Sequence, residues 1–380
     1  MDDASPRAVL LRDYRVPPYL VSHVDLHFEL GDDATRVRSR LRIVRNPAAA
    51  QSARTLRLDG HSLALHSIML DGVALPPARY RHDAAGLEMD EVPDRFELET
   101  LVELRPQDNT ALEGLYLSRG MYCTQCEAEG FRRITFFPDR PDVLARYTTT
   151  IVADRERFPV LLSNGNRVGA GELDGGRHWV CWEDPFPKPG YLFALVAGNL
   201  ARVEDRFVTC SGREVVLRIF VEEKDLDKCG FALRSLQQAM RWDEERFGRE
   251  YDLDTFMIVA VDDFNMGAME NKGLNIFNTQ AVLANPAITT DAAFQRIAGI
   301  VAHEYFHNWS GNRVTCRDWF QLSLKEGFTV FRDSEFSADT GSRAVRRIEN
   351  VNLLRSSQFA EDAGPMAHPV RPDSYIEINN

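Results

Sequence analysis

The 380-residue sequence has few cysteines, no long apolar run and no basic excess. Its six cysteines are scattered along the chain, which excludes a dense disulfide framework. Nowhere do about 18 apolar residues follow one another, so we expect no transmembrane helix and no membrane partner. Residues 1–6 lack the basic and apolar regions of a signal peptide. From these absences we expect a soluble, cytoplasmic protein.

Acidic residues outnumber basic ones, 57 against 45, which gives a formal net charge of -12. Binding to a phosphate backbone requires a basic surface, so nucleic acid is not an expected partner. An acidic pocket would instead suit a cationic group on a substrate. Hydrophobic residues make up 44% of the chain, enough for sizeable cores, and the length suggests two or three domains.

Cys123 and Cys126 form a C-x-x-C pair. A zinc knuckle needs a second such pair, and the sequence has none. A redox pair is the other alternative, but no thioredoxin-like βαβ pattern surrounds these residues. We therefore interpret them as two reduced thiols on a turn.

Residues from about 10 to 200 carry the pattern of strands. Apolar and polar residues alternate over 24–30, 36–43 and 96–104, which is typical of half-buried antiparallel strands. The dipeptide Asp71-Gly72 predicts a hairpin, and Asn164-Gly165 predicts a further turn. No long amphipathic helix is expected here. We predict a β-rich antiparallel domain over residues 1–200.

The pattern changes after the proline-rich segment 185–190. Residues 191–197 and 255–261 predict buried strands, and apolar residues at helical spacing predict a helix over 225–247. Further helices are expected at about 290–309, 322–340 and 343–360. This mixture of α and β predicts a second domain over residues 201–380.

The segment 303–307 reads H-E-x-x-H, inside the helix predicted for 290–309. Residues four apart lie on one helix face, so both imidazoles can bind one zinc ion at about 2.0–2.1 Å. Glu304 lies roughly 100° further round the helix, beside the metal, where it suits a base acting on water. Chance predicts only about 0.01–0.02 such patterns in this chain. The alternative is a surface helix with two solvated histidines.

The start of this helix has its own signals. Thr290 is the predicted N-cap, and Asp291 is an acid in the first turn, where the helix dipole favours negative charge. The apolar residues Phe294, Ile297, Ala298, Val301 and Tyr305 form the stripe expected to face the core.

A catalytic zinc takes three protein ligands and keeps a fourth position open. Glu326 lies 19 residues after His307 on the next predicted helix, and a helical hairpin would bring it against the histidines. The alternative is an ordinary helix glutamate. Asp333 lies seven residues further on the same helix face. As a hypothesis it accepts the outer N–H of a ligating histidine, and a solvated aspartate is the alternative.

Two further segments carry acidic residues with neighbours that suit binding. In 264–273, the small residues Gly267 and Ala268 let backbone approach a ligand closely. An extended segment there can pair with a substrate peptide by strand addition, with Glu270 at one end. The other segment is 125–132, in the first predicted domain, and contains Glu127 and Glu129.

H-E-x-x-H, then 18 residues, then Glu, together with G-A-M-E-N at 267–271, resembles the zinc aminopeptidases of the aminopeptidase N family. Segments 123–132, 301–309 and 324–336 match this family too, and the resemblance runs over essentially the whole chain. It implies an α+β multidomain fold, in which a β-rich N-terminal domain rests on a thermolysin-like α/β domain, truncated here.

The resemblance also implies roles. His303, His307 and Glu326 would bind one zinc ion per chain, and Glu304 would be the general base. Glu127 and Glu270 would hold the substrate's free α-ammonium. The backbone of 267–268 would bind the peptide, and Gln125 and Met266 would line the pocket for its first side chain. The expected substrate-binding residues are Gln125, Glu127, Met266, Gly267, Ala268, Met269, Glu270 and Asn271.

We therefore expect a monomeric zinc aminopeptidase of alanyl-type specificity that removes neutral or basic N-terminal residues from peptides. The family also has a catalytic tyrosine whose place falls past Asn380, and Tyr375 is too early to match it. The alternative is accordingly an N-terminal fragment that binds zinc and peptide but is impaired in catalysis, and that exposes apolar surface. A relative that also hydrolyses an epoxide is less favoured, because nothing indicates a lipid pocket. A thermolysin-type endopeptidase is less favoured, because Glu127 and Glu270 are expected to bind a peptide N-terminus.

Overall fold

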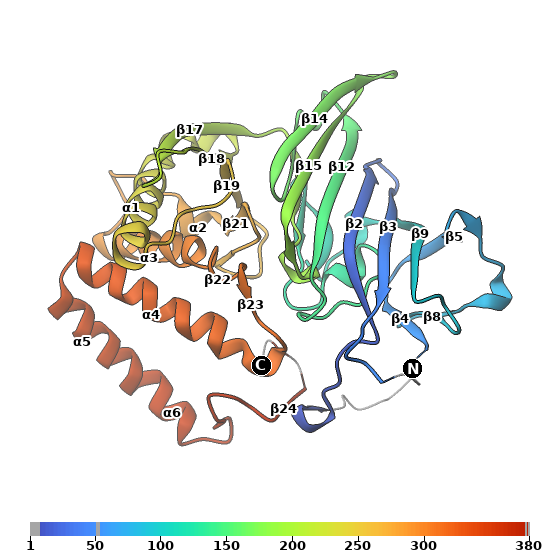
Figure 1. The fold of residues 1–380 in the computed structure, drawn as a ribbon. Helices are drawn as coiled ribbons and strands as arrows, with labels where there is room; N and C mark the ends of the chain where they lie inside the picture. Colours follow the sequence, from blue (N-terminus) through green and yellow to red (C-terminus); the bar gives the residue numbers. More distant parts are fainter. Residues whose placement is uncertain (1–7, 51–53, 377, 379–380) are drawn as a thin grey trace.

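The computed structural model describes residues 8–50, 54–376 and 378. Figure 1 shows a β-rich part, coloured blue to green, beside a mixed part that contains the helices, coloured yellow to red. Residues 1–6, on which the expectation of no signal peptide rests, lie outside the described residues, as does Asn380.

The β-rich part is built on an eight-stranded sheet in the order β14-β15-β12-β2-β3-β9-β5-β6. Among these described strands the neighbours are antiparallel, except that β12 pairs with β2 in parallel. The prediction of an antiparallel sheet is therefore wrong for that one pair. The strands are β2 (Tyr19–Glu29), β3 (Thr35–Arg45), β5 (Ala64–Leu70), β6 (Val73–Ala74), β9 (Arg95–Leu104), β12 (Ala145–Asp154), β14 (Asn166–Leu173) and β15 (Arg177–Lys188).

Alternation in the sequence becomes the two faces of this sheet. Along β3 the residues alternate between buried and exposed, and the exposed arginines face glutamates of β9. Arg40, for example, donates a 2.9 Å hydrogen bond to Glu99. Opposite charges across neighbouring strands stabilise the pairing modestly. The arginine and glutamate rows thus form the outer, solvated face of the sheet, while residues such as Val37 and Leu41 fill the core.

Smaller sheets complete this part of the molecule. A four-stranded sheet has the order β10-β11-β16-β13, a three-stranded sheet has the order β4-β8-β7, and β1 pairs with β24. Their strands are β1 (Val9–Leu10), β4 (Leu56–Asp59), β7 (Arg81–Asp83), β8 (Gly86–Met89), β10 (Gly114–Ser118), β11 (Met121–Gln125), β13 (Val160–Ser163), β16 (Leu195–Gly198) and β24 (Ser374–Tyr375). Short 3₁₀ turns lie at Leu11–Asp13, Pro77–Arg79, Pro106–Asp108, Phe131–Arg133, Gly190–Leu192, Glu223–Lys228 and Trp319–Gln321.

Two predictions about this part need correction. The strand expected over 191–197 begins only at Leu195, because the Asn164 side chain binds the carbonyl of Leu192 and the N–H of Ala194 in place of a strand partner. Cys123 and Cys126 are free thiols as expected, but only Cys126 lies at a turn. Cys123 lies within β11 and both side chains are buried in the core.

The mixed part contains a five-stranded sheet in the order β17-β18-β19-β21-β20. Its central strands β18, β19 and β21 are parallel, and the short strand β20 pairs antiparallel at one edge. The strands are β17 (Ala201–Val208), β18 (Glu214–Val221), β19 (Thr255–Val261), β20 (Ala268–Met269) and β21 (Leu274–Asn278), with a separate pair β22 (Ser310–Gly311) and β23 (Val314–Thr315). We keep residue 200, just before β17, as the proposed domain boundary.

The helices of this part agree closely with the predicted ranges. They are α1 (Gly230–Phe247), α2 (Thr279–Val282), α3 (Asp291–Phe306), α4 (Leu322–Thr340), α5 (Arg343–Leu353) and α6 (Phe359–Asp362), with a π-helical turn at Leu354–Gln358. The helix predicted from 225 begins at 230, because the preceding residues form a 3₁₀ turn. Among the described helices, none is both long and apolar enough to cross a membrane.

Helix α3 lies against α1 and α4, and its predicted stripe is buried at Ile297, Val301 and Tyr305 and half-buried at Phe294 and Ala298. Thr290 caps it by accepting a hydrogen bond from the Ala293 N–H, as predicted. Ile297, Val301 and Tyr305 pack in one core with α1 and the five-stranded sheet. This packing fixes α3 and therefore fixes the direction in which its last turn points.

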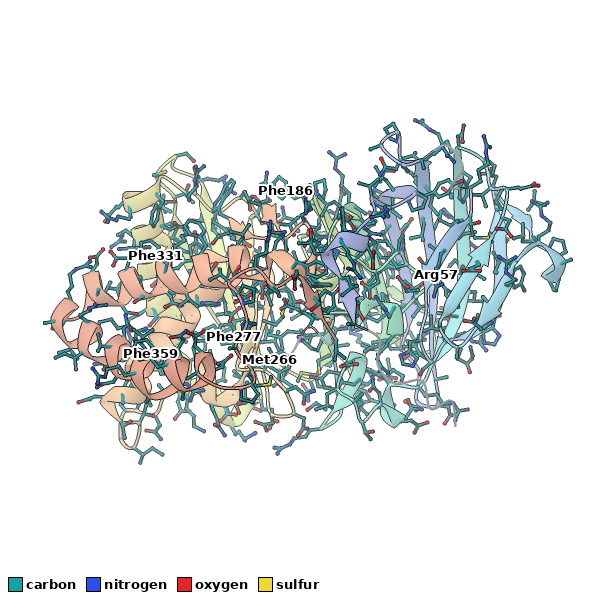
Figure 2. The ribbon with its side chains drawn as sticks, turned by 90° about the horizontal axis from the view of Figure 1, so that it is seen from below. Arg57, Phe186, Met266, Phe277, Phe331 and Phe359 are labelled. Carbon is teal, nitrogen blue, oxygen red and sulfur yellow. The ribbon has the colours of Figure 1, made fainter. Side chains whose placement is uncertain are left out.

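In the first turns of helix α4 the usual pattern is reversed, because polar residues are buried and apolar residues are exposed. Its polar residues Lys325, Thr329 and Arg332, spaced i, i+4 and i+7, are buried. Its apolar residues at the same spacing are exposed, Leu324 by 70%, Phe328 by 51% and Phe331 by 55%. Figure 2 labels Phe331 on this helix and Phe359 on α6. The inner face of α4 is thus a row of polar groups, directed at the end of α3.

Candidate metal centre

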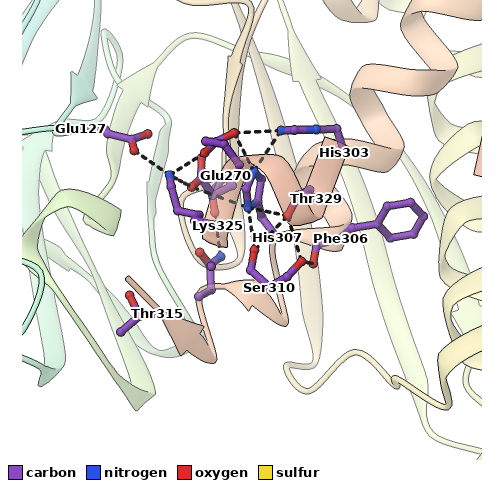
Figure 3. Close-up of polar contacts among 12 residues, drawn as sticks. Glu127, Glu270, His303, Phe306, His307, Ser310, Thr315, Lys325 and Thr329 are labelled. Atoms are coloured by element: carbon purple, nitrogen blue, oxygen red, sulfur yellow. Dashed lines mark hydrogen bonds and ion pairs between the residues drawn. The ribbon is translucent and has the colours of Figure 1, made fainter. Parts of the chain in front are cut away.

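The end of α3 presents two imidazoles side by side. His303 lies in the last turn of α3 and His307 is its C-cap residue. Their Nε2 atoms are 3.0 Å apart. Glu326, near the start of α4, places its Oε2 atom 3.4 Å from Nε2 of His303 and 3.5 Å from Nε2 of His307. Figure 3 shows His303 and His307 close together, near Lys325.

These separations fit a single zinc ion. Ligand atoms at about 2.0–2.1 Å in tetrahedral directions lie about 3.3 Å from each other. The three observed separations, 3.0, 3.4 and 3.5 Å, cluster about that value. Two imidazoles and one carboxylate form the donor set of hydrolytic zinc sites that keep a fourth position open. The residues therefore fit the metal that the sequence predicted.

The outer ring nitrogens explain why a cation belongs there. Nδ1 of His303 lies 2.7 Å from Oδ2 of Asp333, and Nδ1 of His307 lies 2.8 Å from the Ser310 carbonyl oxygen. Both partners are acceptors, so each Nδ1 carries its proton and each Nε2 is left with a bare lone pair. Two lone pairs facing each other at 3.0 Å repel unless a metal ion or a proton lies between them. Burial lowers the pKa of His303, but Asp333 and Glu326 outweigh this effect and raise it to about 11, so this corner of the site attracts positive charge. Asp333 lies where the sequence hypothesis placed it.

Glu304 is buried beside this group. Its Oε2 atom has no hydrogen-bond partner within the described residues. Burial raises the pKa of the Glu304 carboxyl well above its usual range, and the nearby His303 opposes this shift only in part. A carboxylate with a raised pKa accepts a proton more readily than an exposed one. The arrangement therefore suits a base.

Glu127 and Glu270 converge on one lysine. The Nζ atom of Lys325 donates hydrogen bonds to Oε1 of Glu127 at 2.6 Å and to Oε1 of Glu270, and it lies 2.9 Å from Oε1 of Glu326. Glu127 follows β11 in the β-rich part, whereas Glu270 follows β20 in the mixed part. Three carboxylates therefore surround one ammonium, and the group keeps a negative excess.

The pKa values of these groups reflect burial and the shared lysine. Burial raises the pKa of Glu127 to about 7, although Lys325 opposes the shift. Burial alone would raise the pKa of Glu270 as well, but Lys325 and His307 hold it below its usual range. Desolvation disfavours the ammonium of Lys325, yet Glu127 and Glu270 raise its pKa well above its usual range. Lys325 is thus charged at neutral pH, and Glu127 titrates close to neutral pH.

The remaining predicted residues divide into two groups. Met266 is 46% exposed, just before the edge strand β20, and Gln125 is buried with its side-chain N–H donating to the Glu127 carbonyl at 3.2 Å. Gly267 accepts from the Asn278 N–H at 2.9 Å, and Ala268 pairs with Phe277. The side chains of Met269 and Asn271 are buried, so the structure does not bring them to an open pocket.

Sequence reasoning missed four residues of this region: Ser310, Lys325, Thr329 and Arg332. Ser310 contributes a backbone carbonyl, which no residue type signals. The other three had a signal in retrospect, since polar residues at i, i+4 and i+7 share one helix face. Glu326 and Asp333 were already assigned to neighbouring positions on that side of α4.

Comparisons with known proteins agree across both parts of the chain. The peptidase M1 N-terminal domain matches residues 22–192, and the peptidase family M1 domain matches residues 231–380. Aminopeptidase N of Caulobacter vibrioides is 58% identical over 376 residues, covering 99% of this chain and 43% of that protein. Aminopeptidase N of Escherichia coli is 57% identical over 375 residues, covering 99% of this chain and 42% of that protein.

A solved structure shows the same fold. The crystal structure of Legionella pneumophila aminopeptidase A in complex with aspartic acid superposes with a TM-score of 0.91 at 38% identity. The match covers 98% of this chain and 42% of that one. The chain thus spans less than half the length of the relatives that it matches. The fold is a β-rich N-terminal domain followed by an α/β peptidase M1 domain.

Proposed function

Since the chain belongs to the peptidase M1 family, we propose that it is a zinc-dependent aminopeptidase, which hydrolyses the N-terminal residue from peptides. One observation carries the proposal. Glu326, which completes the metal-ligand triad with His303 and His307, is joined through Lys325 to the carboxylates of Glu127 and Glu270. A hydrolytic centre and an acidic pocket are therefore parts of one cluster.

His303, His307 and Glu326 would hold the zinc ion, with Asp333 and the Ser310 carbonyl orienting the two rings. Zinc in such a site polarises the scissile carbonyl and lowers the pKa of water. Glu304 takes a proton from the attacking water and delivers it to the leaving amine. Its raised pKa suits both transfers, because the group has to gain and then release a proton near neutral pH.

The acidic pocket would select peptide N-termini. With Glu326 assigned to the zinc ion, Glu127 and Glu270 bring two negative charges against the single charge of Lys325. A second ammonium, such as the α-amino group of a peptide, offsets part of this excess. An internal peptide bond brings no cation, so it would leave the buried carboxylates uncompensated. We propose Glu127 and Glu270 as the ammonium-binding residues, with Gln125 and Met266 beside the first side chain.

The edge strand β20 supplies a surface for the peptide backbone. It pairs with β21 on one side only and ends the five-stranded sheet. An extended peptide can add to such an edge through main-chain hydrogen bonds. Gly267 and Ala268 are small enough to let it approach. Peptide binding would thus place the N-terminus towards Glu270, which directly follows β20.

The proposal is tested with an alanyl chromogenic amide and its N-acetylated counterpart. We expect the chain to hydrolyse the free amine only, to lose activity on treatment with a chelator, and to regain it with zinc. Acetylation removes the cation that the acidic pocket binds, so the acetylated amide serves as a matched control. Equal hydrolysis of both amides would contradict the ammonium pocket, and activity that survives chelation would contradict the metal centre.

Narrower features are also proposals. The resemblance to cytosolic members of the family supports a cytoplasmic location and a monomer that acts on peptides with free N-termini. It also supports alanyl-type specificity, with neutral or basic first residues favoured. Neither the described residues nor the relatives favour the alternative of a zinc- and peptide-binding module without catalysis.

A further inference from the structure

The Nδ1–H of His307 is held by a turn, and the carboxylate on that side, Oε1 of Glu270, lies 4.0 Å from Nδ1, beyond hydrogen-bond distance. The Nδ1–H of His307 donates to the Ser310 carbonyl at 2.8 Å. The hydroxyl of Thr329 donates to the same carbonyl at 3.1 Å, and it lies 3.3 Å from Nδ1 of His307 and 2.9 Å from Oγ of Ser310. One threonine on α4 therefore contacts both the ring nitrogen and its acceptor. Figure 3 shows Thr329 beside His307 and Ser310.

Arg332, one helical turn after Thr329, holds the ends of the same turn. Its Nη1 donates to the Phe306 carbonyl at 2.8 Å and to Oγ of Ser310 at 2.9 Å. Its Nη2 donates to Oδ1 of Asp243, on α1. The residues of this chain of contacts are buried: Asp243, Ser310, Thr329 and Arg332. Because water does not compete there, each hydrogen bond restricts motion more than it would at the surface.

The two histidines are thus oriented by different means. His303 donates to the side chain of Asp333, which attracts its N–H by charge. His307 donates to a neutral backbone carbonyl, whose direction depends on the conformation of residues 306–310. Arg332 fixes that conformation without leaving a net charge beside His307, because Asp243 accepts from the same guanidinium. A loose turn would let the ring rotate or exchange tautomer.

We propose that Thr329 and Arg332 are positioning residues, which fix the ring and tautomer of His307 so that its Nε2 lone pair is directed at the metal. The inference rests on the proposed zinc function and extends it to residues beyond the ligands and Asp333. It links α1 to the metal centre through Asp243, Arg332 and the Ser310 turn. Loss of the Thr329 hydroxyl then weakens zinc binding even though the ligands are intact.

The test compares two variants of Thr329 with the unchanged chain by zinc competition with a chromogenic chelator. Thr329→Val keeps the shape of the side chain but removes its hydroxyl, and we expect zinc to bind about 10–100-fold more weakly. Thr329→Ser restores the hydroxyl, and we expect affinity within about threefold of the unchanged chain. Melting of the zinc-free proteins checks that each variant folds.

Because Thr329→Val could fail to fold, a second comparison uses Ser310→Ala with Ser235→Ala as its matched control. Each serine is buried and donates to a helix carbonyl four residues earlier, Phe306 and Phe231 respectively. Only Ser310 also contacts Arg332 and Thr329. We expect both variants to melt at similar temperatures without zinc, and Ser310→Ala alone to bind zinc more weakly.

The outcomes separate this inference from the proposed function. If the unchanged chain binds no zinc, both are overturned. If it binds zinc and Thr329→Val binds it equally tightly, the positioning role alone is overturned. The same holds if Thr329→Ser and Thr329→Val lose affinity equally, since the hydroxyl then has no part, or if Ser235→Ala loses as much affinity as Ser310→Ala.

Discussion

Nζ of Lys325 lies 2.6 Å from Oε1 of Glu127, although 198 residues separate them along the chain. The contact joins α4 to the loop after β11 and closes the acidic side of the metal centre. Lys325 is buried and also forms ion pairs with Glu270 and Glu326. It therefore stabilises carboxylates from both parts of the molecule.

Replacing Lys325 by Met should destabilise the protein. Removing one partner of a buried ion pair leaves an uncompensated charge and typically costs about 3–5 kcal/mol. We expect the free energy of unfolding in urea to fall by about this amount at pH 7. The loss should shrink towards pH 5, because protonation relieves the unpaired carboxylates. Arg343→Gln, at an exposed ion pair with Glu335, is the control. A loss no larger than the control's would show that Lys325 is not the main counter-charge.

Replacing Glu304 by Gln should abolish turnover and leave the metal in place. The substitution keeps the size of the side chain but removes its ability to accept a proton, which contributes about 10²–10⁴-fold in rate. Hydrolysis of an alanyl amide and zinc content by atomic absorption measure the two effects. Substantial turnover with full zinc occupancy would assign the base to another group.

Substrate affinity should depend on pH through Glu127. Its pKa of about 7 lies above the usual carboxyl range, so the negative form that attracts an ammonium is lost as pH falls below 7. The α-amino group of a peptide stays protonated there, since its pKa is about 8. We expect KM to rise from pH 7.5 to 5.5, approaching tenfold per unit, and to be nearly flat in Glu127→Gln. A parallel rise in that variant would locate the titration elsewhere.

Zinc should stabilise the chain, and Glu326 should be required for this effect. A ligand that binds only the folded state at about 1,000 times its Kd adds about 4.1 kcal/mol to the free energy of unfolding. We expect the melting temperature to rise with zinc and to fall again with a chelator. Glu326→Ala should lose most of the rise. If its melting temperature responded to zinc as the unchanged chain does, the ion would be bound elsewhere.

The apolar stripe of α4 should make the chain, which we propose is a monomer when dilute, associate weakly as its concentration rises. Leu324, Phe328 and Phe331 are exposed at i, i+4 and i+7, and contiguous apolar surface of this kind promotes contact between molecules. Replacing all three by Gln should lower the association seen in sedimentation velocity without weakening zinc binding. Glu335→Gln, a polar change on the same helix, should leave association unaltered. Equal association in both variants would place the contact on another surface.

The features that could be predicted from the sequence depend on local spacing. The start of α3 and most of its buried stripe follow from Thr290 and from apolar residues at helical intervals, and the alternation of β3 follows from its own residues. The parallel pairing of β12 with β2 leaves no such trace, since alternation is the same in either direction. Likewise, Asn164 replaces strand contacts of residues 30 positions away.

The inner face of α4 is a second feature that local sequence spacing predicts only in part. Spacing placed Glu326 and Asp333 towards the histidines, but apolar residues usually mark the buried side of a helix. Here Lys325 and Arg332 are buried instead, because Glu127, Glu270 and Asp243 come from distant elements to meet their charges. Only the tertiary fold brings those partners together, so propensity and periodicity along α4 cannot reveal them.

Glu127 belongs to the β-rich domain, while Glu270 and Lys325 belong to the peptidase M1 domain. In the proposed function, preference for a free chain end would therefore depend on residues from both domains and not on either domain alone. A chimera that exchanges the β-rich domain with that of a relative would replace Glu127 and its surroundings while keeping Glu270 and Lys325. The substrate selectivity of the chimera would depend on how well the two domains pack at this interface. The domain interface is therefore a place where new specificities can arise.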